Sequence, residues 1–393
     1  MIDFERMREE EFPAARLGPY LNTAGDGLNP KCVINAMKDC LEFDLQRGAG
    51  TNYDERVYKF SDRLRAKMAD FIHADVKEIA LARSTSDALS AFANGIRFNA
   101  GQNVVANDLE FPSNAYAWMN LKQKGVDVRL VKNRDGIILP EDIEKAIDKN
   151  TRVVTISSIS MFSGARAEIE RLGALCKERN VHFVVDAIQQ LGAFDLDVKK
   201  CHVDMLASGC YKWLMVPNGV GYLFVDEGIL GELDVSKVGW QNVKNERDFF
   251  EVPGATYDLT FKDDASKFHE SHPGVPGIYG LDAALGLISK IGIANIEQRV
   301  LHLTDLLIDG AKTLGIRIVS PLEDKYRSGI VVIEPKNIEE AYAEMLRKNI
   351  SVSLRSAGIR ISPHFYNNEK DIAVLLEVLD NRRFRNDDQR QQS

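Results

Sequence analysis

The chain has 393 residues, of which 45% are hydrophobic and 27% are charged, and its formal net charge is −8. This length favours two or three domains around a sizeable core. The acidic balance argues against a general affinity for nucleic acid or for an anionic membrane surface. No run approaches the ~18 apolar residues that a membrane-spanning helix needs. We therefore expect neither nucleic acid nor a membrane as a partner.

The cysteine content indicates a reducing compartment. The chain has five cysteines and no C-x-x-C pair: Cys32, Cys40, Cys176, Cys201 and Cys210. An odd and scattered set fits neither a disulfide framework nor a structural zinc site. The acidic residues 1–16 also lack the basic start and apolar stretch of a signal peptide. We therefore expect free thiols, no metal site and a cytoplasmic protein.

Helix and strand signals alternate from about residue 29 onward. Short apolar runs predict strands at 78–82, 103–106, 126–131, 153–157, 182–185, 204–208 and 221–225. Helical periodicity lies between them, at 30–41, 88–96, 141–147 and 169–179. Apolar strands that alternate with helices are typical of a mainly parallel sheet covered by helices on both faces.

The pattern changes after about residue 230. Residues 239–264 are irregular and rich in aromatic and charged side chains, and helical periodicity returns at 278–315. A strand at 329–333, a helix at 338–347, a strand pair at 351–355 and 358–362, and a helix at 370–379 follow. We predict an α/β protein with an N-terminal segment (1–20) that packs with the small domain, a large domain (21–275), a smaller α+β domain (276–380) and a disordered tail (381–393).

Polar groups follow three of the predicted strands, whereas nicotinamide, P-loop, zinc-protease and serine-hydrolase motifs are absent from the sequence. Asp186 ends one apolar strand, and Lys212 follows the next one between two aromatic residues. Thr85 and Ser86 lie where a strand meets a helix N-terminus, which is a phosphate-binding arrangement. An acid, a lysine and a phosphate cradle at one sheet edge fit pyridoxal 5′-phosphate (PLP). Its aldehyde forms a Schiff base with lysine, and an acid keeps its ring nitrogen protonated.

With these residues the chain resembles the class V aminotransferase family of fold-type I PLP-dependent enzymes. That family includes cysteine desulfurases, selenocysteine lyase-like proteins and isopenicillin N epimerase-like proteins. The resemblance runs from Tyr20 to Asn367 and is most specific at 110–114, 185–189, 208–214 and 360–367. It implies the fold-type I PLP-dependent transferase fold and a homodimer with shared active sites.

The resemblance also implies a role for individual residues. Lys212 is the implied Schiff-base lysine, Asp186 is its catalytic partner at the pyridine nitrogen, and Arg360 binds the substrate carboxylate. The other implied cofactor contacts are Thr85 and Ser86 at the phosphate, Phe111 on the ring and Gln189 at the phenolic oxygen. Tyr211 stands in place of a phosphate-binding histidine. His272 stands where relatives bring a threonine to the phosphate of the neighbouring subunit.

Two departures from the desulfurases bear on the reaction. Met161 stands where they place an asparagine near the cofactor oxygen, and no cysteine follows Cys210, so the loop at 320–328 lacks their nucleophile. We interpret Cys210 as a small buried thiol. The sequence therefore predicts a C–S or other β-elimination lyase that acts on an amino acid or derivative with a free carboxylate. An aminotransferase, an epimerase and a catalytically inactive PLP-fold binding protein stay open as alternatives.

Overall fold

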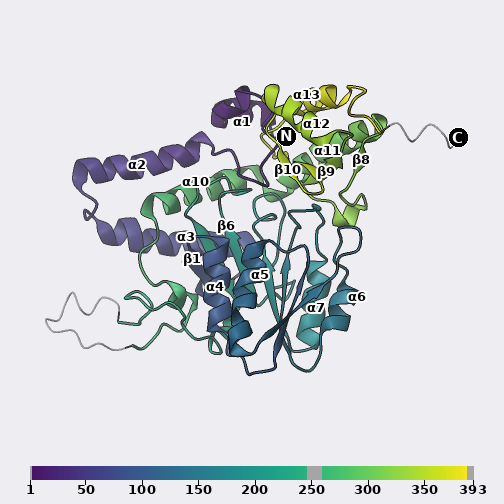
Figure 1. The fold of residues 1–393 in the computed structure, drawn as a ribbon. Coiled ribbons are helices and arrows are strands. Elements are labelled where there is room, and N and C mark those ends of the chain that lie inside the picture. Colours follow the sequence, from purple (N-terminus) through teal and green to yellow (C-terminus); the bar gives the residue numbers. More distant parts are fainter. Residues whose placement is uncertain (1, 246–258, 387–393) are drawn as a thin grey trace.

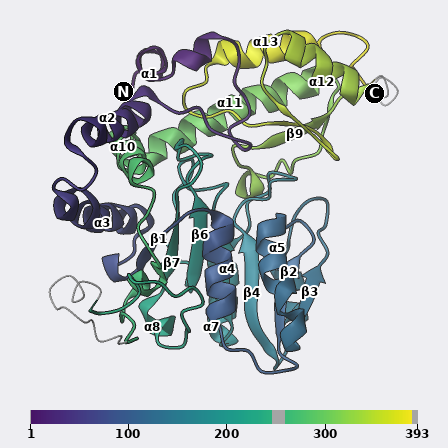
Figure 2. The same cartoon turned by 60° about the vertical axis from the view of Figure 1, so that its left-hand side comes forward.

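The computed structural model describes residues 2–245 and 259–386. Its larger part is built on a seven-stranded sheet in the order β1-β7-β6-β5-β4-β2-β3 (Figures 1 and 2). The strands are β1 (Ile79–Ala82), β2 (Asn103–Asn107), β3 (Asp127–Val131), β4 (Thr151–Ser157), β5 (His182–Asp186), β6 (Met205–Gly209) and β7 (Gly221–Val225). The helices of this part are α2 (Lys31–Arg47), α3 (Phe60–Ile72), α4 (Thr85–Gly95), α5 (Pro112–Met119), α6 (Pro140–Ala146), α7 (Ile169–Glu178) and α8 (Glu227–Leu230). This architecture confirms the predicted α/β fold class.

The sheet is mainly parallel, and β7 is the strand that runs antiparallel to both of its neighbours. The loop 210–220, which contains no helix, joins β6 to β7. A parallel pair needs a crossover of a dozen or more residues, usually a helix. Because the loop is too short for a crossover, β7 returns beside β6. Lys212 is thereby kept at the carboxyl edge of β6.

Successive strand residues point into two separate hydrophobic layers. Val184 of β5 belongs to the layer that also contains side chains of α4 and α5, such as Phe92 and Trp118. Val185 belongs to the opposite layer, with Leu172 of α7. A strand that is buried on both faces reads as a continuous apolar run, which is the signal that the sequence carries.

The smaller part is an antiparallel sheet with helices on it. Its strand order is β10-β11-β9-β8, and its core is separate from the two layers of the larger sheet. The strands are β8 (Arg317–Ile318), β9 (Val331–Glu334), β10 (Ser353–Arg355) and β11 (Gly358–Ile361), and the helices are α11 (Ile293–Thr313), α12 (Ile338–Arg347) and α13 (Glu369–Leu379). The predicted strand 351–355 is shortened at its start because Ser351 forms a bridge with Tyr20 instead.

The helical stretch predicted at 278–315 is two helices. The helix α10 (Val275–Ile291) ends at Gly292, which has φ +85°, and α11 leaves at a bend of 79°. Figures 1 and 2 show that α10 lies beside α2. The next helix, α11, leads the chain from α10 into the smaller part. Among the described residues no single helix is long and apolar enough to cross a membrane; α10 and α11 pass that test only as a bent pair, and both bury apolar residues in the core.

Both ends of the described chain pack against the smaller part. The helix α1 (Phe4–Glu11) is held there by Arg8, which donates to both carboxylate oxygens of Asp371 at 2.6 and 2.9 Å. At the other end, Phe384 is fully buried. The tail expected at 381–393 is thus packed as far as Asn386, whose side chain donates to the Glu334 carbonyl. Residues 387–393 of that tail, and 246–258 of the predicted irregular segment, lie outside the described residues.

The pair of Arg8 with Asp371 provides a stability test. The two side chains are 13% and 6% exposed, so Arg8→Met leaves a buried carboxylate without its cation. We expect the free energy of unfolding to fall by about 3 kcal/mol in urea denaturation. The control is Arg6→Ala, which breaks an exposed pair with Glu10 and is expected to change the free energy of unfolding far less, because solvent screens that pair. Equal losses in the two variants would show that α1 is not anchored by Arg8.

Candidate active site

Asp186 and the loop that carries Lys212 lie at the same edge of the sheet. The strands β5 and β6 are parallel neighbours, and Asp186 pairs in register with Ala207. Both side chains are buried, with Asp186 2% and Lys212 6% exposed. One carboxylate oxygen of Asp186 accepts a hydrogen bond from the Ile188 amide at 3.1 Å. The Lys212 amine makes no hydrogen bond or ion pair to any described residue, so it is available to a ligand.

Burial perturbs both of these groups. It raises the pKa of Asp186, and the nearby charge of Glu110 raises it further. It lowers the pKa of Lys212, against the opposing attraction of Asp186. Each group is therefore less easily charged than in water, and a buried amine of lowered pKa is a better nucleophile. A bound cation beside Asp186 would restore its ionised form.

The loop after β6 is rigid. The Met215 amide donates to the Lys212 carbonyl, and the Val216 amide donates to the Cys210 carbonyl, at 3.1 and 3.0 Å. Gly27 packs on this loop so closely that a Cβ there would lie 2.0 Å from the Lys212 carbonyl oxygen. Only glycine fits at that approach. The position of Lys212 is thus fixed by its own backbone and by a distant segment of chain.

Gln189 is committed to contacts within the protein. Its side-chain oxygen accepts from the Trp213 indole at 2.9 Å, and its side-chain nitrogen donates to the Ala24 carbonyl at 3.0 Å. An amide nitrogen carries two protons, so one remains for another acceptor. The predicted contact of Gln189 with a cofactor oxygen is restricted to that second proton.

The phosphate-binding candidates lie in the first turn of α4. The helix begins at Thr85 rather than near 88, because Ser84 is its N-cap and accepts from the Asp87 amide at 3.1 Å. The Thr85 hydroxyl accepts from the Gly209 amide at 2.8 Å, which ties the helix start to the end of β6. The Ser86 hydroxyl lies 2.6 Å from that of Ser113 at the start of α5. Two hydroxyls and a helix N-terminus therefore meet at this edge.

Two aromatic rings flank the lysine. The Lys212 nitrogen lies 5.7 Å from the centre of the Phe111 ring and 5.6 Å from that of Tyr211. Phe111 is 38% exposed, so part of its side chain is open to a ligand. This placement agrees with a ring that stacks on a flat ligand.

Glu110 is a site residue to which the sequence assigned no role. Its buried carboxylate accepts from the side chains of Asn107 and Asn114 and from both the amide and the hydroxyl of Ser157. These contacts join β2, α5 and β4 at the residue that precedes Phe111. The signal in the sequence is an acid with an asparagine three residues before it and another four residues after it.

Arg360 reaches the site from β11 of the smaller part. It is 1% exposed, and its Nη1 donates to the Met161 carbonyl at 3.4 Å. Its Nε and Nη2 have no hydrogen-bond partner. Burial lowers the pKa of its guanidinium to about 10. Buried donors without partners are rare in native proteins, and they mark this arginine as a binding group for an anion.

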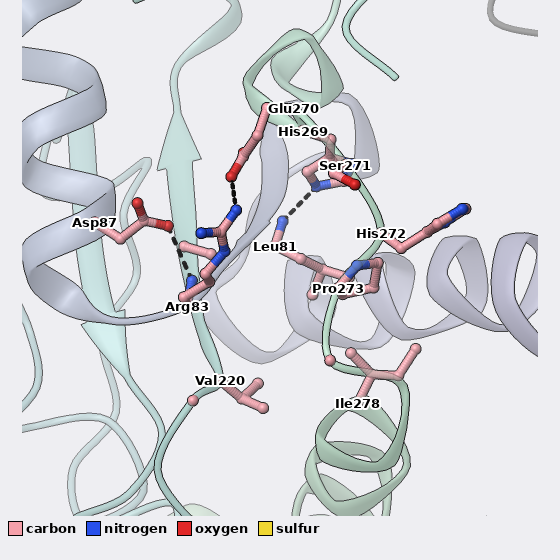
Figure 3. A pocket seen from close by; sticks show the side chains of 13 residues that line it. Leu81, Arg83, Asp87, Val220, His269, Glu270, Ser271, His272, Pro273 and Ile278 are labelled. Atoms are coloured by element: carbon pink, nitrogen blue, oxygen red, sulfur yellow. Dashed lines mark hydrogen bonds and ion pairs between the residues drawn. The ribbon is translucent and has the colours of Figure 1, made fainter. Parts of the chain in front are cut away.

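His272 lies in the segment before α10, and it lines a pocket together with Arg83 and Asp87. In Figure 3 its side chain points away from Arg83 and Asp87. Its ring sits among aromatic rings, with centres 5.2 Å from Tyr53 and 4.8 Å from Trp240. Its role at the phosphate of a neighbouring subunit stays a prediction, as does the homodimer.

The other residues form a set that fits PLP. A buried amine without a partner suits the aldehyde, and a buried carboxylate on the adjacent strand suits a protonated ring nitrogen. The first turn of α4 suits the phosphate. Lys212, Asp186, Thr85, Ser86 and Phe111 would hold the cofactor, and Arg360 would face its substrate.

Known proteins resemble this chain over nearly its whole length. The model of the family Aminotransferase class-V matches residues 19–375. A probable cysteine desulfurase of Methanothermobacter thermautotrophicus is 28% identical, over 94% of this chain and 96% of that protein.

Solved structures share the fold. An apo cysteine desulfurase of Thermococcus onnurineus has a TM-score of 0.86 and 27% identity, over 97% of this chain and 98% of that one. A C-DES mutant with glycine covalently linked to the PLP cofactor has a TM-score of 0.88 and 19% identity, over 97% of this chain and 100% of that one. A second structure shows C-DES, described as a cystine C–S lyase, in complex with its reaction product cysteine persulfide. It has a TM-score of 0.86 and 20% identity, over 95% of this chain and 100% of that one.

The family match, together with a buried lysine and acid at one sheet edge, identifies the chemistry of this fold. The chain belongs to the class V aminotransferase family and is a PLP-dependent enzyme.

Proposed function

We propose that the protein is a C–S or other β-elimination lyase that acts on an amino acid or derivative with a free α-carboxylate. The observation that carries this proposal is the distribution of its cysteines. A desulfurase needs a thiolate that reaches the substrate sulfur and carries the persulfide away. All five cysteines lie at or before residue 210, and the loop 320–328 has none.

The five cysteines are also poorly suited to act as nucleophiles. Burial raises the pKa of each of these thiols, to about 12 for Cys32 and to about 11 for Cys201. Cys210, the one beside Lys212 in sequence, is fully buried in the rigid loop. Reactive cysteines have a lowered pKa and an accessible sulfur. A sulfur that leaves the substrate would therefore leave as a free small molecule.

The proposed roles use the groups at the sheet edge. PLP, when bound, supplies an aldehyde for the substrate amine and a ring that accepts electron density. Lys212 holds the cofactor and, once substrate has taken its place, moves the proton at Cα. Asp186 keeps the ring nitrogen protonated, and Arg360 orients the substrate by its α-carboxylate. A cysteine conjugate and water would give pyruvate, ammonia and a free thiol.

Two alternatives use the same residues. Transamination and epimerisation also need an acid, a lysine and a carboxylate-binding arginine, and a relative in Bacillus subtilis carries an aminotransferase name. A catalytically inactive binding protein of this fold is disfavoured because Lys212, Asp186 and Arg360 are all retained.

The role of Lys212 is testable by chemical trapping. Borohydride reduction of the PLP-loaded protein is expected to fix the cofactor on Lys212, which peptide mapping by mass spectrometry identifies. Lys267 is an internal control, since it is equally buried but donates to the Leu230 and Leu233 carbonyls. Reduced cofactor on Lys267 or another lysine would refute the assignment, and Lys212→Ala is expected to abolish the label.

The reaction type is testable by its products. The measurements are a thiol trap and intact-protein mass spectrometry. From L-cysteine we expect pyruvate, ammonia and sulfide, and from a cysteine conjugate we expect pyruvate, ammonia and the free thiol, in both cases without a protein persulfide. A persulfide on one of the five cysteines, lost with activity when that cysteine becomes alanine, would refute the lyase. A keto acid that forms only with an amino acceptor would identify an aminotransferase.

A further inference from the structure

Two arginines project from the same face of the hairpin formed by β10 and β11. Ser353 pairs with Arg360 across the hairpin, and Arg355 pairs with Gly358. Directly paired residues share a face of a sheet, as do residues two apart in one strand. Arg355 and Arg360 are therefore diagonal neighbours, about 7–8 Å apart at their backbones. Gly358 has no side chain, which leaves the position opposite Arg355 open.

This face of the hairpin is directed at the active site. The Ser353 hydroxyl donates to the Asn22 side chain at 2.5 Å, and the chain from Asn22 continues to Gly27, which packs on the Lys212 loop. Burial is the main cause that lowers the pKa of Lys212, and the positive charges of Arg360 and Arg355 lower it further. Both arginines thus act on the site that holds the lysine.

The two guanidinium groups lack anionic partners. Neither forms an ion pair with any described residue, and Arg355 Nη1 donates only to the adjacent Leu354 carbonyl. The Nε of Arg355 and the Nε and Nη2 of Arg360 are buried without a hydrogen-bond partner. Asp26, the other acid near Lys212, lies 3.4 Å from the amide of Asn218. Arg360 is buried and Arg355 is partly buried, and two neighbouring cations in such surroundings are costly unless anions join them.

One carboxylate does not satisfy both arginines. A carboxylate lies in the fork of a single guanidinium with two parallel hydrogen bonds, and the α-carboxylate is assigned to Arg360. The Nε of Arg355 would then stay buried without a hydrogen-bond partner at the same site.

We propose that Arg355 binds a second anionic group of the substrate. The preferred substrates are amino acids whose departing side chain ends in a carboxylate, such as a cysteine S-conjugate with a terminal acid. This inference rests on the proposed function of the same site and adds the class of its substrate.

A matched pair of conjugates tests the second anionic subsite. S-(2-carboxyethyl)-L-cysteine and its amide, S-(2-carbamoylethyl)-L-cysteine, differ only in the terminal charge. With the holoenzyme we expect kcat/KM to favour the acid by at least about tenfold, as one charge-assisted contact provides. Arg355→Gln is expected to lose this preference, mainly through a higher KM for the acid, and Arg355→Lys to keep part of it. Arg347→Gln, which removes an exposed arginine of α12, is the charge control and is expected to keep the preference.

Two results would overturn the subsite. One is equal turnover of acid and amide by the wild-type protein. The other is an equal loss for both conjugates in Arg355→Gln, which would mean that the two arginines hold a single carboxylate. Thermal unfolding of each variant checks that the fold is intact.

Binding separates this inference from the proposed reaction. Calorimetric titration of both conjugates into PLP-loaded Lys212→Ala measures affinity without turnover. If the wild type cleaves no conjugate but the acid binds at least about tenfold more tightly through Arg355, the proposed lyase reaction is refuted and the anionic subsite is supported. If the conjugates are cleaved and this titration shows no preference for the acid, the anionic subsite is refuted and the lyase reaction is supported.

Discussion

The burial of an acid and a lysine at the ends of two adjacent parallel strands is the constraint on which the rest of the site depends. Asp186 ends β5, and Lys212 lies in the loop after β6. Neither charge is stable alone in such surroundings, and each has a pKa shifted by burial toward its neutral form. A cofactor with an aldehyde and a basic ring nitrogen would resolve both problems, because it would take up the amine and give the carboxylate a cation.

The surrounding structure holds the Lys212 loop and its neighbours in place. Gly27 is packed against the Lys212 carbonyl, and the Trp213 carbonyl on the next residue accepts from the buried His364 ring at 3.0 Å. Glu110, next to Phe111 in sequence, joins three elements. Such supporting contacts come from segments distant in sequence. They explain how one rigid edge is built from both parts of the chain.

The sequence predicted the sheet and the two central residues because their signals are local. Apolar runs of strand length give the buried strands, and Asp186 and Lys212 stand directly after two of them. The antiparallel direction of β7 was not predicted. It depends on the loop 210–220, which is too short for the crossover that a parallel strand would need. The early start of α4 at Thr85 follows from the Ser84 cap, which a periodicity argument overlooks.

Other features depend on contacts that no local pattern carries. Arg355 appeared as a residue of a predicted strand, and its relation to Arg360 follows only from the hairpin register. The predicted tail contains Phe384, one apolar residue in a polar stretch, and tertiary packing buries it. The contacts of the Gln189 side chain with Trp213 and Ala24, which leave one of its amide protons for another acceptor, likewise required the folded structure.

The central claim, that Asp186 activates a cofactor held by Lys212, is tested most directly by Asp186→Asn in the PLP-loaded protein. Asparagine keeps the shape and removes the charge. The account predicts that the variant retains PLP but loses turnover by at least about a hundredfold. Asp204→Asn is the matched control, because Asp204 is a partly buried acid immediately before β6 at the opposite edge of the sheet. Full turnover in Asp186→Asn would contradict the account.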